Sequence, residues 1–372
     1  MKIGVDDSLV DLRRRQVLKG AVACATAIGA ASASGVYAGA SPAATRVPRA
    51  DAHGLKGLRV AVTTDDMALV RGLPHSPGHD PIKTAGAFVR AFDKHGVRGV
   101  YQFSNAVPFV EDPGLLKALD IWGDGGHYFG NHTYQHAPLS KMLSADYVRE
   151  IERAEVVLKR YLERSPRRYF RYCAYQLGNT QCKVNNALGW LVRQNYTPAP
   201  VTVGFDDAMF IMPHLRTTKY GTEAELEWLR ESYVECAVEE LSLAATNAEK
   251  VFKRSPAQIW LIHGTSIAAE CIDRILDRFK REGVVFISLD EALLDPMNMI
   301  PPPIVTTTFM FHIQMWGIAM GTPVEFPRPA IFDEVEKLHP RPGEMTQDMF
   351  KAALSKMDAR WTPEGTPLDH DC

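Results

Sequence analysis

Short apolar runs alternate with longer amphipathic stretches through the middle of the chain. Residues 58–63 form a continuous run with β-branched members, the pattern of a strand buried on both faces. Residues 83–95 repeat apolar side chains at helical spacing and end at Gly96, a common helix terminator. The same alternation continues for more than two hundred residues, which predicts repeated strand–helix units.

Further elements follow from the same patterns. We expect strands near 97–103, 127–130, 169–172, 197–205, 258–262 and 284–289, and helices near 113–123, 144–164, 223–252 and 268–282. Strands that alternate with helices at this spacing are typical of an α/β fold with a mostly parallel sheet, closed or open. No repeat of 20–50 residues is present.

The two ends of the chain differ from this middle part. Residues 13–19 include Arg13, Arg14, Arg15 and Lys19, and residues 20–40 are apolar, rich in alanine, and end in Ala38-Gly39-Ala40, a small-residue cleavage pattern. This order predicts that 1–40 are an export signal, which resembles the bacterial twin-arginine type. Residues 41–57 are then a linker, and 296–372 an appendage over the barrel with a loosely ordered tail.

An uncleaved membrane anchor is the alternative for the first forty residues. The stretch is rich in alanine, glycine and serine and is only weakly hydrophobic for a stable span. We therefore expect the twin-arginine export machinery as a partner, a periplasmic or secreted location, and no stable membrane span in the mature chain.

Composition narrows the class of protein. Of 372 residues, 46% are hydrophobic and 23% charged, the balance of a globular protein with a sizeable core. The net charge of −2 provides no attraction to nucleic acid or to an anionic membrane. Five of the six cysteines remain after cleavage, an odd number that argues against a fully paired framework. Cys173 and Cys182 are a possible pair, but two free thiols are favoured.

Two segments carry side chains suited to chemistry. Asp65 and Asp66 directly follow the first predicted strand, and active sites form at the carboxyl ends of parallel strands. Adjacent side chains in extended structure diverge, which favours different roles for the two carboxylates. His132 and His136 stand four apart, and one Asp with two His, leaving room for water, is the composition of a catalytic metal site. The alternative for Asp65 and Asp66 is an ordinary turn or cap, and the alternative for His132 and His136 is a coincidental pair on the surface.

The order of several motifs resembles a known family. Thr64-Asp65-Asp66, Asn131-His132-Thr133-x-x-His136, Arg171 and Leu261-Ile262-His263 occur in the order of the polysaccharide deacetylase (NodB-homology, carbohydrate esterase 4) superfamily. The resemblance covers residues 58–295, the expected catalytic domain. It implies a distorted (β/α)7-type barrel, with 296–372 as its C-terminal appendage.

The resemblance also implies a role for each matching residue. The implied metal ligands are Asp66, His132 and His136, with a divalent metal, expected to be zinc, as cofactor. Asp65 is the implied catalytic base and His263 the catalytic acid. Arg171 orients the base, and Asp207, or its neighbour Asp206, supports the acid.

The sequence departs from the family pattern around the substrate. Thr64 and Met67 replace the residues that usually flank the acidic pair, and Cys173 replaces the proline of Arg-x-Pro. Ala208 and Met209 stand where an aromatic usually follows the acidic motif. The central site positions are intact, so these changes put the substrate in question and not the chemistry.

Other chemistry-bearing residues have simpler interpretations. His75 and His79, in the loop after the first strand, are expected to be solvent-exposed. The aromatic and methionine stripe at 310–320 is expected to be core, although it would also suit a subsite wall.

The leading hypothesis is an exported, metal-dependent hydrolase that removes acyl groups, N-acetyl above all, from a carbohydrate, cleaving a linear amide. A hydrolase of a non-sugar amide or ester is the alternative. A catalytically weak carbohydrate-binding relative is a third possibility, which the loss of a metal ligand or base would have favoured.

Overall fold

The computed structural model describes residues 46–68, 73–307 and 309–361. The chain divides into Met1–Ala40 and Ser41–Cys372, and every element described below belongs to the second unit. The predicted export signal lies outside the described residues. Within them, no helix has both the length and the apolar character needed to cross a membrane.

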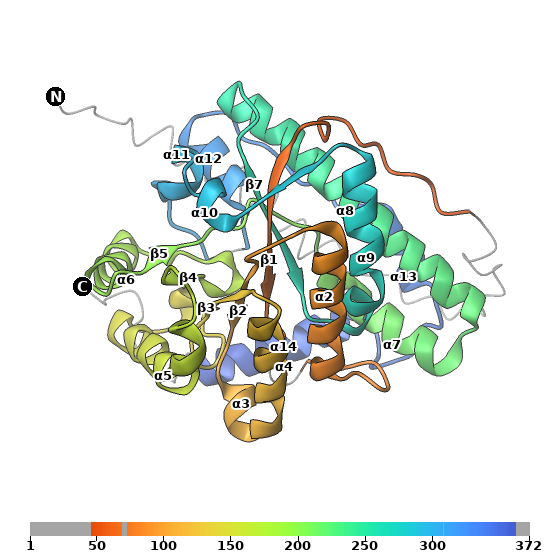
Figure 1. The fold of residues 1–372 in the computed structure, drawn as a ribbon, viewed down its shortest axis with the longest axis horizontal. Helices are drawn as coiled ribbons and strands as arrows, with labels where there is room; N and C mark the ends of the chain where they lie inside the picture. The colour runs from red at the N-terminus through yellow and green to blue at the C-terminus, as the bar shows by residue number, and fades with distance from the viewer. Residues whose placement is uncertain (1–45, 69–72, 308, 362–372) are drawn as a thin grey trace. The chain divides into compact units, whose positions relative to one another are not determined.

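One sheet of parallel strands forms the centre of the fold (Figure 1). Its order is β5-β4-β3-β2-β1-β7-β6, and β8 pairs with β1 beside this path, so that the sheet curls into an incomplete barrel. The strands are β1 Arg59–Asp65, β2 Tyr101–Ser104, β3 Tyr128–Asn131, β4 Tyr169–Phe170, β5 Thr197–Pro198, β6 Val203–Gly204, β7 Gln258–His263 and β8 Val285–Ile287. The α/β barrel class predicted from the sequence is confirmed.

β1 is buried along six of its seven residues, because it has neighbours on both edges and helices over its outer face. It pairs with β7 along most of its length, and Asp65 lies opposite His263 in that pairing. On the other side Asp65 lies opposite Phe103 of β2. This register brings the last residues of three strands together at one end of the barrel.

Helices surround the sheet. Their bounds are α2 Pro81–His95, α3 Val107–Glu111, α4 Leu116–Asp124, α5 Ser144–Leu162, α6 Gln181–Arg193, α7 Ile211–Tyr220, α8 Glu223–Phe252, α9 Ser266–Arg281, α10 Leu289–Ala292, α11 Pro296–Met299, α12 His312–Ala319, α13 Ile331–Glu336 and α14 Thr346–Trp361. Figure 1 shows α2, α8 and α9 grouped on the same side of β1, and α9 packs against both other helices.

Local signals account for the ends of the long helices. The side chain of Asp80 accepts hydrogen bonds from the first backbone N–H groups of α2, which ends at Gly96 with a φ of 71°. A capping box of Thr222 and Glu225 begins α8, and Lys253 ends it in the left-handed conformation.

The prediction of one strand over 197–205 is wrong. The segment contains two short strands, β5 and β6, joined by residues 199–202. Pro198 and Pro200 have no N–H to donate to a neighbouring strand, which prevents continuous pairing. Helix α6, which the sequence patterns did not predict, begins after its N-cap Thr180, whose side chain accepts from the N–H of Lys183.

The C-terminal segment packs against the rest of the fold. Within the expected appendage and tail of 296–372, residues 331–361 contain α13 and α14. Phe332 and Val335 of α13 join the main core. Trp361, the last described residue, packs with Tyr147 and Leu191 in a second cluster. Most of the stripe at 310–320 lies in α12, which buries Ile313 and Met315 as the core interpretation expects, while Met310 and Met315 also line a pocket described below.

The cysteines follow the expectation only in part. Cys173, Cys236 and Cys271 are free, buried thiols. Cys182 is disulfide-bonded, so the expectation of a free thiol there is wrong. An odd number of cysteines excludes complete pairing but leaves room for one bridge.

Candidate active site

Asp65 and Asp66 diverge at the end of β1. Asp66 adopts a φ of 49°, so the backbone turns between the two carboxylates. Asp65 Oδ1 accepts a hydrogen bond from Arg171 Nη1 at 2.8 Å, whereas Asp66 Oδ1 accepts one from Asn105 Nδ2 at 2.5 Å. Both side chains are buried. The two carboxylates therefore have separate hydrogen-bond partners.

His132 and His136 follow β3 in a tight turn and not in a helix. Thr133 and His136 both have positive φ values, of 66° and 59°, and the two imidazole rings lie 4.9 Å apart at their centroids. His132 Nδ1 lies 2.9 Å from the carbonyl oxygen of Arg171, to which it donates, so Nε2 is left to face the carboxylates. Burial lowers the pKa of His132 despite the opposing charges of Asp65 and Asp66, which favours a neutral imidazole.

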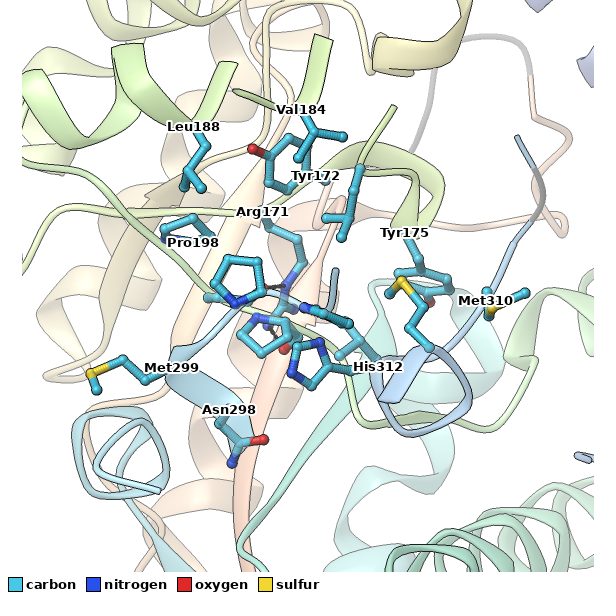
Figure 2. A pocket seen from close by; sticks show the side chains of 17 residues that line it. Arg171, Tyr172, Tyr175, Val184, Leu188, Pro198, Asn298, Met299, Met310 and His312 are labelled. Carbon is cyan, nitrogen blue, oxygen red and sulfur yellow. Dashed lines mark hydrogen bonds between the residues drawn. The ribbon is translucent and has the colours of Figure 1, made fainter. Parts of the chain in front are cut away.

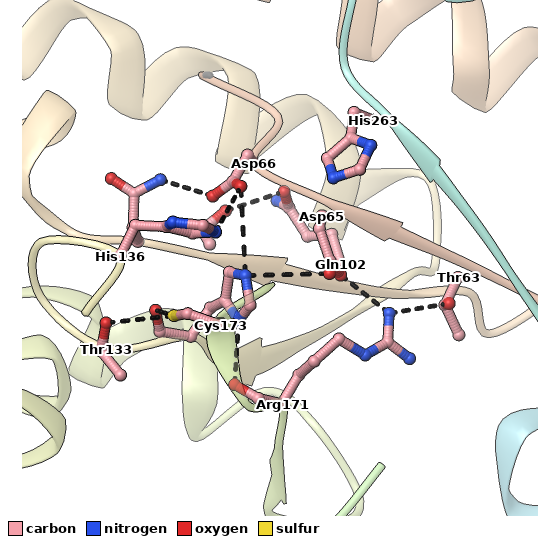
Figure 3. A network of polar contacts seen from close by, with 12 residues as sticks. Thr63, Asp65, Asp66, Gln102, Thr133, His136, Arg171, Cys173 and His263 are labelled. Atoms are coloured by element: carbon pink, nitrogen blue, oxygen red, sulfur yellow. Dashed lines mark hydrogen bonds and ion pairs between the residues drawn. The ribbon is translucent and has the colours of Figure 1, made fainter. Parts of the chain in front are cut away.

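These two histidines and Asp66 converge on one point (Figure 3). His136 Nε2 lies 3.4 Å and His132 Nε2 4.0 Å from Asp66 Oδ2. Asp66 Oδ2 is buried and has no hydrogen-bond partner among the described residues. An ionised oxygen in this position is costly unless a positive charge compensates it.

Arg171 links Asp65 to the wall of the barrel. Nη1 donates to Thr63 Oγ1 at 2.9 Å as well as to Asp65, and Nε donates to the carbonyl of Ala199 at 3.2 Å. The guanidinium also lies 4.1 Å from the centre of the Phe103 ring. These contacts fix the direction of the Asp65 carboxylate.

Two glycines permit the close packing on which this arrangement depends. A side chain at Gly130 would bring Cβ to within 2.3 Å of Phe103, the ring beneath Arg171. A Cβ at Gly264, directly after His263, would lie 2.8 Å from the backbone of Met67. The loops after β1 and β7 approach so closely only because Gly264 has no side chain.

His263 and Asp207 form a paired unit at the end of β7. Asp207 accepts from the backbone N–H of His263 at 2.8 Å and contacts its Nδ1 at 2.7 Å. Burial alone would lower the pKa of His263, but the charge and hydrogen bond of Asp207, with Asp65 and Asp66, raise it to about 9. Of the two acidic candidates it is Asp207 that contacts the histidine, while Asp206 is exposed.

A second set of possible metal donors shares the histidines. Donor atoms of His132, His136 and Cys173 lie within 4.8 Å of one another. Cys173 Sγ, however, donates to the carbonyl of His132 at 3.2 Å, and burial raises the pKa of its thiol well above the usual value. The sulfur lies 3.8 Å from Nδ1 of His132, the nitrogen already engaged by Arg171. This geometry favours Asp66 over Cys173 as the third donor.

Asn105 is a polar residue of the site that the sequence patterns did not single out. Asn105, the partner of Asp66, directly follows β2, and the strand-end rule applied to that strand would have found it.

His75 is exposed as expected, but His79 is half-buried, stacks on His75 at 4.7 Å and contacts Ser266 Oγ. The expectation of exposure is therefore wrong for His79.

The fold and the site together define a class. A curled parallel sheet with carboxylates and imidazoles gathered at the carboxyl ends of its strands has the architecture of a barrel enzyme. Residues 59–192 match the family model described as polysaccharide deacetylase. The match covers residues 59–192 and shows that this part of the chain is similar to polysaccharide deacetylases.

Individual relatives are more distant. A chitin deacetylase of Arthroderma benhamiae is 30% identical over 97 residues, which span 26% of this chain and 26% of that protein. A family 4 carbohydrate esterase of Bacillus subtilis is 16% identical, with a TM-score of 0.40, over 67% of this chain and 85% of that one. An acetyl xylan esterase of Clostridium thermocellum, in complex with cobalt, is 18% identical, with a TM-score of 0.41, over 63% and 90%.

Proposed function

We propose that the chain is a metal-dependent hydrolase that removes N-acetyl groups from a carbohydrate. The observation that carries the proposal is the convergence of two imidazole nitrogens on an unpartnered, buried carboxylate oxygen of Asp66. The family match over residues 59–192 supports the reaction class, and the chitin deacetylase likeness supports a glycan as the substrate.

The donor set suits a divalent cation. Asp66, His132 and His136 would hold it, and two nitrogens with one carboxylate oxygen favour zinc or a similar transition ion. The hydrogen bond from His132 Nδ1 to the Arg171 carbonyl is the kind of outer contact that orients a metal-binding imidazole. When bound, such a cation supplies an acidified water and polarises the acyl oxygen of the substrate.

The remaining residues would accept and donate protons during the reaction. Asp65, held by Arg171, would take a proton from the attacking water, since its Oδ2 faces the same space as His132 Nε2, 3.7 Å away. His263, protonated below pH 9, would donate a proton to the leaving amine. Asp207 fixes the orientation of that imidazole through two contacts.

The test is release of acetate from N-acetylglucosamine oligomers by the mature, zinc-loaded chain. We expect turnover that disappears on chelation and returns with metal. Asp65→Asn is the matched control, because it preserves the shape of the side chain but removes the base. No acetate at saturating metal would contradict the glycan proposal, and turnover of simple acyl amides instead would favour a non-sugar substrate.

We also propose that the enzyme acts in the periplasm or outside the cell. The basic residues 13–15 and the apolar stretch that follows support this location. Replacing Arg14 and Arg15 with lysine is expected to leave the precursor in the cytoplasm, whereas the unaltered chain is exported. Equal export of both precursors would contradict the twin-arginine route.

A further inference from the structure

The barrel has an open side. β5 and β6 are the two edges of the sheet, and among the described strands they do not pair with each other. Residues 199–202 connect them directly, and the N–H of His312 donates to the carbonyl of Val201 at 3.0 Å. The C-terminal segment, through α11 and α12, therefore covers this gap.

A pocket lies in the gap (Figure 2). We call it the seam pocket; its apolar lining includes Val184, Leu188, Pro198, Met299, Met310 and Met315. The space between its walls is about 610 Å³, including the part open to solvent. Of the seven residues predicted for the active site, only Arg171 lines it. The pocket therefore adjoins the site at the strand ends through Arg171 but is lined otherwise by a different set of residues.

Asn298 supplies an unpaired polar atom to this apolar pocket. Its Nδ2 donates to the carbonyls of Ala257 and Ala292, at 2.8 and 3.0 Å, so the orientation of the amide is fixed. Oδ1 therefore points elsewhere, and it is buried with no hydrogen-bond partner among the described residues. The side chain belongs to a residue that is only 2% exposed. Such an acceptor needs a donor from a ligand or a water.

His312 adds a second acceptor. Its Nε2 donates to the carbonyl of Met297 at 2.6 Å, and burial lowers the pKa of the ring to about 4, so the imidazole is neutral. In that tautomer Nδ1 is an acceptor. The guanidinium of Arg171 is already committed to Asp65, Thr63 and Ala199. Asn298 and His312 therefore bring acceptors to the pocket, while Tyr172 and Tyr175, which also line it, carry hydroxyls that can donate or accept.

We propose that the seam pocket is a binding site for an apolar alcohol or phenol. The hydroxyl would donate to Asn298 Oδ1, and the apolar body would lie among the methionine, proline and leucine side chains. Methionine suits such a ligand because its flexible thioether adapts to an irregular apolar shape. A charged ligand is excluded, since it would lose its hydration without gaining a free partner of opposite charge.

A matched pair of probes tests the proposal. Binding of 4-butylphenol and of 4-butylanisole to the metal-loaded mature chain is measured by isothermal titration calorimetry. The anisole carries a methoxy group where the phenol has a hydroxyl, so it has no hydrogen-bond donor and is larger by one methyl group. We expect one phenol per chain and at least tenfold weaker binding of the anisole, because an unmet buried acceptor is costly.

Matched substitutions locate the site. Leu188→Trp fills the pocket from α6 and is expected to weaken phenol binding at least tenfold. Val192→Trp is the control, because Val192 stands one turn later on α6, is 61% exposed and does not line the pocket. Met299→Trp, at a position 54% exposed, serves as a second blocking variant if Leu188→Trp does not fold.

Each outcome decides the proposal. Selective binding of the phenol that is lost in a folded blocking variant and kept in Val192→Trp supports it. No stoichiometric binding to the unaltered chain overturns it, and so does unchanged binding in the blocking variants. Equal affinity for the phenol and the anisole overturns the role of Asn298.

Discussion

The site of Asp65, Asp66, His132 and His136, here called the strand-end site, and the seam pocket each contain one buried oxygen atom without a hydrogen-bond partner among the described residues. The surroundings of the two oxygen atoms differ. Asp66 Oδ2 faces the Nε2 atoms of His132 and His136, among groups that carry or stabilise charge. Asn298 Oδ1 belongs to a neutral amide beside a pocket rich in methionine and proline. The first environment calls for a cation, and the second for a neutral donor on an apolar body. An unmet hydrogen-bonding group therefore predicts a ligand only together with the charge of its neighbours.

The comparison extends to how each region is built. The strand-end site is assembled from the last residues of strands and from loops with unusual backbone conformations, including positive φ at Asp66, His136 and Ala174. Non-glycine residues in this region of φ cost of order 1 kcal/mol each. The seam pocket instead depends on where a C-terminal segment covers the sheet. A change at the strand ends should therefore affect metal and turnover, and a change at the seam should affect apolar ligands.

The largest effect is expected from Asp66→Ala. Removing this carboxylate deletes one of three proposed ligands, so we expect loss of bound metal and a fall in turnover of about 10³-fold or more. Metal content after gel filtration, with acetate release, measures both. Asp65→Asn is the contrasting variant, with metal retained and turnover lowered by about 10²–10⁴-fold.

Equal metal content in Asp66→Ala and the unaltered chain would contradict the assignment of Asp66 as a metal ligand. The seam pocket provides an internal check, because 4-butylphenol should bind Asp66→Ala as it binds the parent. Loss of phenol binding in that variant would mean that the two regions are not independent.

Asp207→Asn is expected to have an intermediate effect that depends on pH. The charge of Asp207 contributes to the raised pKa of His263, about 9, and below that value the proposed acid carries its proton. Asparagine removes the charge, so the pKa should fall toward the ordinary histidine value of about 6.5. The alkaline limb of the rate profile then moves to lower pH, with roughly a 30-fold loss at pH 8 and little change at pH 6.

A bound cation opposes the contribution of Asp66 to this pKa, so the limb of the parent enzyme lies at or below about pH 9. The measurement is turnover against pH at saturating metal and substrate. An unchanged alkaline limb in Asp207→Asn would contradict the assignment of His263 as the acid.

The two regions also differ in how far the sequence predicts them. Asp65, Asp66 and His132 stand in local motifs at strand ends, and the order of these motifs along the chain is sufficient to identify them. The register that sets Asp65 opposite His263 follows from β1 and β7 being neighbours. Sequence patterns did not locate Asn105, although the same strand-end rule applies to it.

The seam pocket could not be predicted in this way. The unpaired state of Asn298 Oδ1 depends on two backbone carbonyls, one of them 41 residues away, that hold its Nδ2. The gap itself depends on the failure of β5 and β6 to pair, and periodicity had predicted one continuous strand there. Such features arise from tertiary packing, which local patterns of hydrophobic and polar residues do not contain.

The smallest effect is expected from Cys173→Ala, which decides between the two donor sets. If Asp66 is the third ligand, the variant should retain its metal, with an affinity within about threefold of the parent. The free energy of unfolding should fall by only about 1 kcal/mol, because the thiol donates one hydrogen bond to the His132 carbonyl. Cys271→Ala is the matched control, because Cys271 is another free, buried thiol whose contact is the carbonyl of Arg230. Competitive titration with a zinc chelator compares the three proteins. A loss of metal in Cys173→Ala, but not in Cys271→Ala, would transfer the site to His132, His136 and Cys173. In that case the unpaired Oδ2 of Asp66 would carry a proton and would not bind a cation. The contrast with Asn298 would then disappear, because neither oxygen would need a positively charged ligand.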